Sequence, residues 1–298
     1  MKTGLILENV SKTFVGKKAV DKISFSLNKP GVFGLLGTNG AGKTTTIRML
    51  LGIIKKDNGE ITWNGKKVDR KSVNFGYLPE ERGVYPKVKI YDQLMYFAEL
   101  KGMKKQEADS AISNWAKKLK VEEYMQMPAE KLSKGNQQKI QFMTSVIHNP
   151  ELVVLDEPFS GLDPVNTELL KNIIIDLVKE EKYVIMSAHQ MSTIEEFCSD
   201  ILILNKGKTV LQGNLREIKD QYPANRVQIE ANESIAETIA KLGLEIENEK
   251  NNEYTVKIDN EEQAHNLLNE LVKDKKTINK FEITKPTLND IFIEKVGE

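Results

Sequence analysis

The sequence of 298 residues contains a single cysteine and no long hydrophobic run. The lone Cys198 excludes an internal disulfide and fits a reducing compartment. The apolar runs are short, such as Ile201–Leu204, and none approaches the roughly 18 residues that a membrane-spanning helix needs. The amino terminus, Met1–Gly4, lacks the apolar segment of a secretory signal, so we expect no cleaved leader. These absences favour a protein of the cytosol.

The formal net charge is zero, but the charges are unevenly distributed along the chain. Residues 225–298 contain 10 basic and 16 acidic residues, whereas the preceding part has an excess of basic ones. Neither part carries the strongly basic stripe of a nucleic-acid-binding protein, so we expect no nucleic-acid partner. The composition changes near Tyr222, which predicts two folding units, 1–218 and 222–298.

The most informative segment is the glycine-rich stretch Gly37–Thr44, which matches the pattern G-x-x-x-x-G-K-[S/T] of phosphate-binding loops. Residues 30–36 before it read as a short buried strand, and residues 45–51 after it begin a helix. A strand, a glycine turn and a helix N-terminus together direct backbone N–H groups and a positive dipole end at one point, which suits a polyphosphate. The alternative is a glycine-rich turn that contains Gly-Lys-Thr by chance.

This pattern predicts that Lys43 reaches the β- and γ-phosphates of ATP and that the Thr44 hydroxyl holds Mg²⁺. The predicted ATP-binding residues of this segment are Gly37, Thr38, Asn39, Gly40, Ala41, Gly42, Lys43, Thr44 and Thr45.

Two later strands end in polar residues that could serve the same ligand. Leu152–Leu155 reads as a buried parallel strand that delivers Asp156 and Glu157 at its carboxyl end. Tyr183–Ala188 reads as another buried strand, followed directly by His189. Taken singly, the two acids fit an ordinary strand end and His189 a hydrogen-bonded core histidine. Their presence in one chain with the phosphate loop favours a functional role.

Three further segments complete the outline. Residues 88–150 have helical spacing, and within them Ser133 is placed as the N-cap of a helix. Residues after Tyr222 follow the order β-α-β-β-α-β, which predicts a small ferredoxin-like α+β unit. Phe14 lies between two amino-terminal strands, either as an aromatic face for adenine or as a half-buried strand residue, and its local sequence leaves both readings open.

In their order, these motifs resemble the ATPase subunit of ABC transporters over residues 5–215. The loop after Pro79 takes the place of the Q-loop of that family, and Leu132–Asn136 resembles its signature motif. Leu152–Glu157 looks like Walker B with the adjoining glutamate, Ser160–Asp163 matches the D-loop, and His189 matches the switch histidine. The acidic tail resembles the accessory domain of some bacterial exporter ATPases, including the sodium-efflux type.

The resemblance implies an α/β P-loop fold, with a mixed sheet core and a helical subdomain at about 88–150, followed by the ferredoxin-like domain. It implies that Asp156 orients Mg²⁺ together with Thr44, that Glu157 orients the attacking water and accepts its proton, and that His189 senses the γ-phosphate. The signature residues Ser133, Lys134, Gly135 and Asn136 would bind the ATP of a second subunit, with Asp163 in the D-loop. One chain would then hold half of a site at each of two faces.

The chain departs from the pattern of the family at two positions. Glu80 stands where a glutamine is usual, and we expect it to contact Mg²⁺, although its charge adds repulsion near a triphosphate. Lys134 stands where the signature motif usually has glycine, and its side chain could approach the phosphates of the partner or point to solvent. Neither departure removes a catalytic group, so the sequence predicts an active ATPase.

The resemblance therefore predicts a peripheral ATPase at the cytoplasmic face of a membrane, active as a dimer, that drives export through a separate permease. Sodium or a drug-like compound is the expected cargo. Two alternatives remain. One is a soluble ABC-type ATPase that acts on ribosomes or DNA. Proteins of that class usually contain tandem domains, coiled coils or basic arms. The other is a regulatory module that binds ATP without hydrolysing it.

Overall fold

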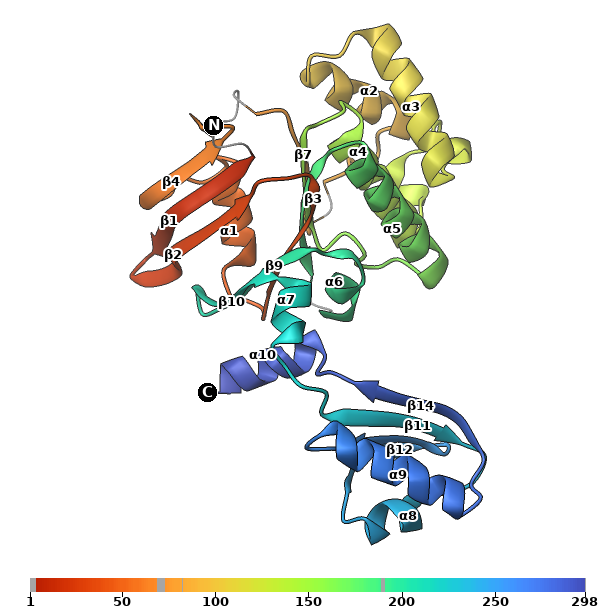
Figure 1. The fold of residues 1–298 in the computed structure, drawn as a ribbon. Coiled ribbons are helices and arrows are strands. Elements are labelled where there is room, and N and C mark those ends of the chain that lie inside the picture. Colours follow the sequence, from red (N-terminus) through yellow and green to blue (C-terminus); the bar gives the residue numbers. More distant parts are fainter. Residues whose placement is uncertain (1–3, 69–72, 82, 189–190, 298) are drawn as a thin grey trace. The chain divides into compact units, whose positions relative to one another are not determined.

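The computed structural model describes residues 4–68, 73–81, 83–188 and 191–297. The chain divides into two compact units between Gly213 and Asn214, and Figure 1 shows the elements of each. The change in composition predicts this boundary slightly later, between residues 218 and 222. The short helix α7 (Leu215–Asp220) groups with the second unit, where its last residue forms an ion pair with Lys285.

The first unit begins with an antiparallel sheet in the order β2-β1-β4-β5. Its strands alternate apolar and polar residues, so one face is buried and the other meets solvent. The strands are β1 (Leu5–Phe14), β2 (Lys17–Leu27), β4 (Asn58–Trp63) and β5 (Lys66–Lys67).

A second sheet, in the order β10-β9-β3-β8-β7-β6, carries the loop and the polar strand ends identified in the sequence. Strands β9, β3, β8, β7 and β6 pair in parallel, so their carboxyl ends meet at one edge. Every residue of β7 is buried, which confirms the prediction of a buried parallel strand there. The strands are β3 (Gly31–Gly37), β6 (Phe75–Leu78), β7 (Leu152–Asp156), β8 (Tyr183–Ala188), β9 (Asp200–Asn205) and β10 (Lys208–Asn214).

The helices of the first unit cover this sheet and build a helical lobe from α2 and α3 (Figure 1). They are α1 (Lys43–Leu50), α2 (Ile90–Leu100), α3 (Lys105–Leu119), α4 (Lys134–Val146), α5 (Pro164–Lys179) and α6 (Met191–Phe197), with short 3₁₀ turns at Glu122–Tyr124 and Ala129–Lys131. Within the described residues, we find no helix that combines the length and the apolar character needed to cross a bilayer.

The second unit follows the predicted order β-α-β-β-α-β, and all of its strand pairs are antiparallel in the order β12-β13-β11-β14. Figure 1 shows α8 and α9 against one face of the sheet, where Ile229, Val256 and Leu267 contribute to a core. This topology confirms the ferredoxin-like prediction. The elements are β11 (Arg226–Ala231), α8 (Ala236–Lys241), β12 (Glu245–Lys250), β13 (Glu253–Lys257), α9 (Glu261–Lys273), β14 (Ile278–Thr284) and α10 (Leu288–Gly297).

His148, just after α4, lies against the first residue of β6. Its Nε2 lies 3.1 Å from the carbonyl oxygen of Phe75, and its Nδ1 is buried without a hydrogen-bond partner among the described residues. Burial, together with the nearby ammonium of Lys101, lowers the pKa of His148 from its usual 6.5 to about 4. Protonation would place an unpaired N–H donor and a second positive charge in this contact.

We therefore predict that acid destabilises the first unit. Between pH 6.5 and about 4, the unfolded chain binds a proton at His148 that the folded chain does not bind, so the free energy of unfolding falls as the pH falls. Because the side chain is partly exposed, we expect a loss of about 1–2 kcal/mol. Urea unfolding followed by tryptophan fluorescence measures it, since Trp63 and Trp115 both lie in the first unit.

His148→Gln, which keeps an N–H donor for Phe75, should remove most of this pH dependence. His265→Gln changes an exposed histidine of the second unit and should leave the dependence intact. An unchanged slope in His148→Gln would contradict the assignment.

Candidate functional site

The glycine loop connects the carboxyl end of β3 to the first turn of α1. Within the loop, the N–H of Ala41 donates to the carbonyl of Thr38 at 3.1 Å. Gly42, the N-cap of α1, has a φ of 107°, and a Cβ there would lie 2.7 Å from the carbonyl oxygen of Ala19. Only glycine accepts both the backbone angle and the close approach without strain.

Among the described residues, no side chain caps the amino end of α1, so the N–H groups of its first turn are available for a ligand. A hollow of about 330 Å³ lies in front of this turn. Its lining includes eight of the nine predicted loop residues, and Asp156, Glu157 and Glu80 join them from β7 and from the end of β6. Three segments far apart in the sequence thus meet where the sequence analysis expected phosphates and Mg²⁺.

Lys43 is 6% exposed and lies at the base of this hollow. Its ammonium donates to the carbonyl of Gly37 at 2.7 Å and to that of Thr38 at 3.3 Å. Burial lowers the pKa of Lys43, although the carboxylates of Glu157, Asp156 and Glu80 act against that shift. One buried ammonium therefore lies within the field of three carboxylates.

Asp156 is oriented by Ser187, a residue that the sequence analysis missed. Asp156 and Ser187 are paired residues of the neighbouring strands β7 and β8. The Ser187 hydroxyl donates to Oδ1 of Asp156 at 2.5 Å, and its oxygen accepts from the backbone N–H of Glu157 at 3.1 Å. The only signal in the sequence is that Ser187 lies two residues before His189 at the end of a buried strand.

The remaining oxygen of Asp156 fits a metal ligand. Asp156 is 1% exposed, and its Oδ2 is buried without a hydrogen-bond partner among the described residues. A buried carboxylate oxygen without a donor is costly unless a ligand or ion uses it. Mg²⁺ commonly takes one or two carboxylates together with substrate phosphates and does not need a full protein cage. Asp156 and Thr44 are therefore a suitable pair for Mg²⁺ at this position.

Glu157 has a strained backbone, with a φ of 54°. A residue other than glycine, asparagine or aspartate rarely occupies this region, and such strain is concentrated at functional sites. The conformation follows directly after the Asp156 strand end and is held by the hydrogen bond to Ser187. Glu157 is half-buried and lines the hollow, which suits a group that handles water beside a phosphate.

The signature residues do not line this hollow. Ser133 is the N-cap of α4, as the sequence predicted, and its hydroxyl accepts from the N–H of Asn136 at 3.2 Å. Ser133 and Lys134 are exposed, while Gly135 and Asn136 are half-buried. Asp163 caps α5 in the same way and is exposed.

One predicted residue outside the glycine loop and the signature and D-loop segments, Phe14, does not line the hollow. Phe14 is 44% exposed at the end of β1, and the ammonium of Lys12 lies 5.3 Å from the centre of its ring. It is not among the lining residues, so its role in adenine binding stays a prediction. His189 lies outside the described residues.

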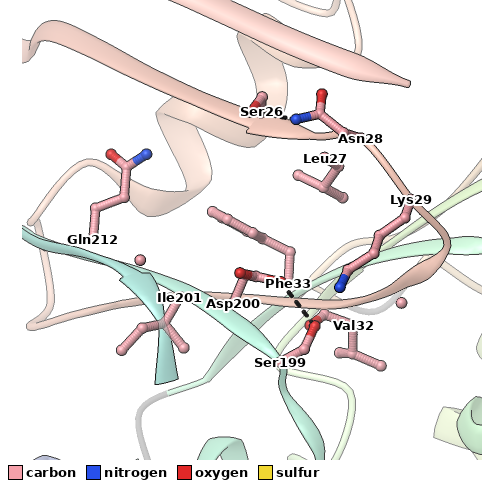
Figure 2. A pocket seen from close by; sticks show the side chains of 12 residues that line it. Ser26, Leu27, Asn28, Lys29, Val32, Phe33, Ser199, Asp200, Ile201 and Gln212 are labelled. Atoms are coloured by element: carbon pink, nitrogen blue, oxygen red, sulfur yellow. Dashed lines mark hydrogen bonds between the residues drawn. The ribbon is translucent and has the colours of Figure 1, made fainter. Parts of the chain in front are cut away.

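A second hollow, of about 320 Å³, lies at the opposite edge of the same sheet, where β3 and β9 begin. Figure 2 shows its lining, in which the Ser199 hydroxyl donates to the carbonyl of Val32. Lys29 and Asp200 are its charged residues. It lacks the glycine loop and the grouped carboxylates, so the first hollow is the better candidate for a phosphate-binding site.

Two sequence models of known families match the chain. One, described as "ABC transporter", matches residues 20–160. The other, described as "ATP-binding protein DrrA1-3-like, C-terminal domain", matches residues 213–296. The first match includes the glycine loop, Glu80, Asp156 and Glu157, which line the hollow, and the second covers the ferredoxin-like unit.

The chain is also similar to individual proteins. It is 45% identical over 294 residues to the uncharacterised ABC transporter ATP-binding protein YhaQ of Bacillus subtilis (strain 168), and the match covers 98% of each chain. It is 30% identical over 226 residues to the ABC transporter ATP-binding protein NatA of the same species, covering 72% of this chain and 91% of NatA. A solved ATP-binding subunit of an ABC transporter matches with a TM-score of 0.68 at 26% identity, covering 74% of this chain and 93% of that one.

We predict that Ser187→Ala lowers the rate constant of Mg²⁺-dependent ATP hydrolysis about tenfold or more, because Asp156 and the Glu157 backbone lose their common anchor. Steady-state assays at varied Mg²⁺ concentration measure this. Ser187→Thr keeps the hydroxyl and should retain most of the activity. Ser145→Ala removes an equally buried hydroxyl that donates to Phe142 within α4, and it should change the rate less than twofold. Equal losses in the two alanine variants would contradict the role of Ser187.

Proposed function

The chain belongs to the family of ABC transporter ATP-binding proteins, and we propose that it works as a head-to-tail dimer that drives export through a separate membrane permease. Family membership confirms the resemblance read from the ordered motifs. It also makes the chain an ATP hydrolase whose activity is coupled to transport. The observation that best supports a working site is the meeting of the glycine loop with Asp156, Glu157 and Glu80 around one hollow.

In this proposal, the loop amides and Lys43 bind the phosphates of ATP. Lys43 would exchange its two loop carbonyls for phosphate oxygens, which are stronger partners for an ammonium. Thr44 and Asp156, with Glu80 near them, would hold Mg²⁺, which supplies positive charge to the phosphate oxygens when bound. Glu157 would orient the attacking water and accept its proton, and His189 would contact the γ-phosphate.

The exposed start of α4 supports the dimer. Ser133 and Lys134 face solvent and not the hollow of their own chain, so the signature residues Ser133 to Asn136 are available to the ATP of a second copy. The hydroxyl, the backbone N–H groups and the amino end of α4 are suitable ligands for its γ-phosphate. Asp163, exposed at the start of α5, would lie at the same interface.

Glu157→Gln tests the proposal. The amide cannot accept a proton, so we expect hydrolysis to fall at least a hundredfold while ATP binding persists. The variant should then accumulate as an ATP-bound dimer, which size-exclusion chromatography with Mg²⁺ and ATP detects. Glu180→Gln, a change at an exposed carboxylate at the end of α5, should keep full activity.

Hydrolysis by Glu157→Gln within threefold of the wild type would overturn the role of Glu157. The alternative of a binding module predicts a different result, namely no Mg²⁺-dependent turnover by the wild type even with its permease.

We place the contact with the permease on the helical lobe, where aromatic side chains gather at the surface. The rings of Tyr85 and Phe97 stack with centres 6.0 Å apart, and Tyr96 meets Phe97 edge-on at 5.7 Å. Tyr85 is 50% exposed, Tyr96 53% and Leu100 68%. Exposed aromatic and apolar groups in one patch are typical of a protein interface. The patch lies on α2 and on the loop that leads from Glu80, so a force on it can reach the ATP site.

The buried Gln93 fixes this loop to α2. Its Oε1 accepts from the N–H of Tyr85 at 3.1 Å, and its Nε2 donates to the carbonyl of Val88 at 3.2 Å. The loop under the aromatic patch is therefore held in place by hydrogen bonds before any partner binds, which suits a docking site.

We predict that Tyr96→Ala lowers stimulation of ATP hydrolysis by the permease at least fivefold, because it removes an exposed aromatic ring from the proposed contact. The basal rate without permease should stay within twofold of the wild type. Val272→Ala changes a similarly exposed apolar residue of the second unit and should leave stimulation intact. Reconstitution with the cognate permease measures both rates. Full stimulation of Tyr96→Ala would place the contact elsewhere.

The proposed cargo is Na⁺ or a drug-like compound, and the proposed direction is export. This rests on the resemblance of the acidic tail to the accessory domain of exporter ATPases, and on the similarity of the chain to NatA and to the DrrA1-3-like domain. The place of action would be the cytoplasmic face of the membrane, at the permease.

A further inference from the structure

Gln141, in the second half of α4, joins this helix to the segment that carries Glu80. The side chain is 2% exposed. Its Nε2 donates to the carbonyl of Pro79 at 3.1 Å and to the carbonyl of Glu81 at 2.8 Å. One buried amide therefore holds the backbone on both sides of Glu80.

The orientation of this amide is fixed by its partners, because two carbonyl oxygens can only accept hydrogen bonds. Both N–H groups are used on this segment, and Oε1 is buried without a hydrogen-bond partner among the described residues. An unpaired buried oxygen is unfavourable.

A second contact joins α4 to β6. Gly76 of β6 lies so close to α4 that a Cβ would come within 1.8 Å of the carbonyl oxygen of Ser145. The strand β6, which ends two residues before Glu80, is thus in close contact with the backbone of the helix that begins after Ser133. Gln141 and Ser145 are one turn apart on that helix, so two adjacent points attach it to β6 and its exit.

Glu80 itself points its charge toward the phosphate loop. It lines the hollow, and its carboxylate is one of the three that act on the pKa of Lys43. A free carboxylate beside a triphosphate is repelled, whereas one that shares a cation with it is attracted. At this position, Glu80 should therefore weaken the binding of ATP without Mg²⁺ and strengthen the binding of ATP with Mg²⁺.

We propose that Gln141 is the positioning residue that holds Glu80 at the phosphate hollow, and that it thereby ties the ATP site of one chain to the signature helix that serves the other. This rests on the proposed function of Glu80 and Ser133. Because α4 begins after Ser133, a shift of α4 on binding the second ATP is passed by Gln141 to the backbone around Glu80.

The test compares equilibrium binding of a fluorescent ATP analogue to the full chain in Mg²⁺ and in EDTA. Gln141→Met keeps the volume and removes both donors. We expect it to weaken binding about threefold to fivefold in Mg²⁺ and to leave it unchanged or tighter in EDTA. A loss that comes only from damaged packing would weaken binding by the same factor in both conditions, and that result would overturn the proposal.

A double-mutant cycle shows whether Gln141 acts through Glu80. In a Glu80→Ala background, Gln141→Met should change the Mg²⁺-dependent affinity less than 1.5-fold. Gln137→Met is the matched control, because Gln137 lies on the same helix and its amide donates to the carbonyls of Ala129 and Leu132 instead. Its effect should be the same in both backgrounds. Equal effects of Gln141→Met in both backgrounds would contradict the proposal.

Hydrogen exchange on the wild type keeps the proposal testable if Gln141→Met does not fold. Residues 134–146 and the backbone around Glu80 should gain protection at the same ATP concentration, and protection of α4 alone would overturn the link. A different result would refute the proposed function. A wild type that neither dimerises on ATP nor hydrolyses it would refute the dimer, but it would not affect the contact of Gln141 with Pro79 and Glu81.

Discussion

The uncapped amino end of α1 is the constraint on which the rest of the site depends. Its first N–H groups need an acceptor, and no side chain of the helix provides one. A bound anion satisfies them, but Asp156, Glu157 and Glu80 surround the same hollow with negative charge, against which Lys43 is the buried cation. A triphosphate accompanied by Mg²⁺, as proposed, would meet both requirements, because the anion would accept from the N–H groups and the cation would balance the carboxylates.

The parallel sheet determines which carboxylates reach this point. Neighbouring parallel strands end at a common edge, so β7 brings Asp156 beside Ser187 of β8. The single Ser187 hydroxyl serves two residues, since it orients the Asp156 carboxylate and holds the N–H of Glu157. This second bond helps to maintain the left-handed backbone of Glu157, so the two successive acids have different backbone conformations.

The two ends of α4 connect the parts of the proposed cycle. Its first turn presents Ser133 to solvent, and its second half holds the Glu80 segment through Gln141. The aromatic patch around Tyr96 lies on α2, in the helical lobe. In the proposed function, the helical lobe would contact the permease, and α4 would contact both the ATP of a second copy and the backbone around Glu80, so that a change at one of these contacts could be transmitted to the others.

The sequence by itself determined the family, the order of the elements and the loop Gly37–Thr44, because these depend on local patterns such as glycine spacing, apolar runs and helix caps. It also predicted the cap at Ser133 and the ferredoxin-like unit. Tertiary structure alone decided that Ser187 supports Asp156 and that Gln141 holds the backbone around Glu80. The contact of Ser187 joins residues that are 31 positions apart in the sequence, and the contacts of Gln141 join residues about 60 positions apart. The local sequence around a polar side chain in a strand or helix does not indicate which distant residue it will contact in the fold.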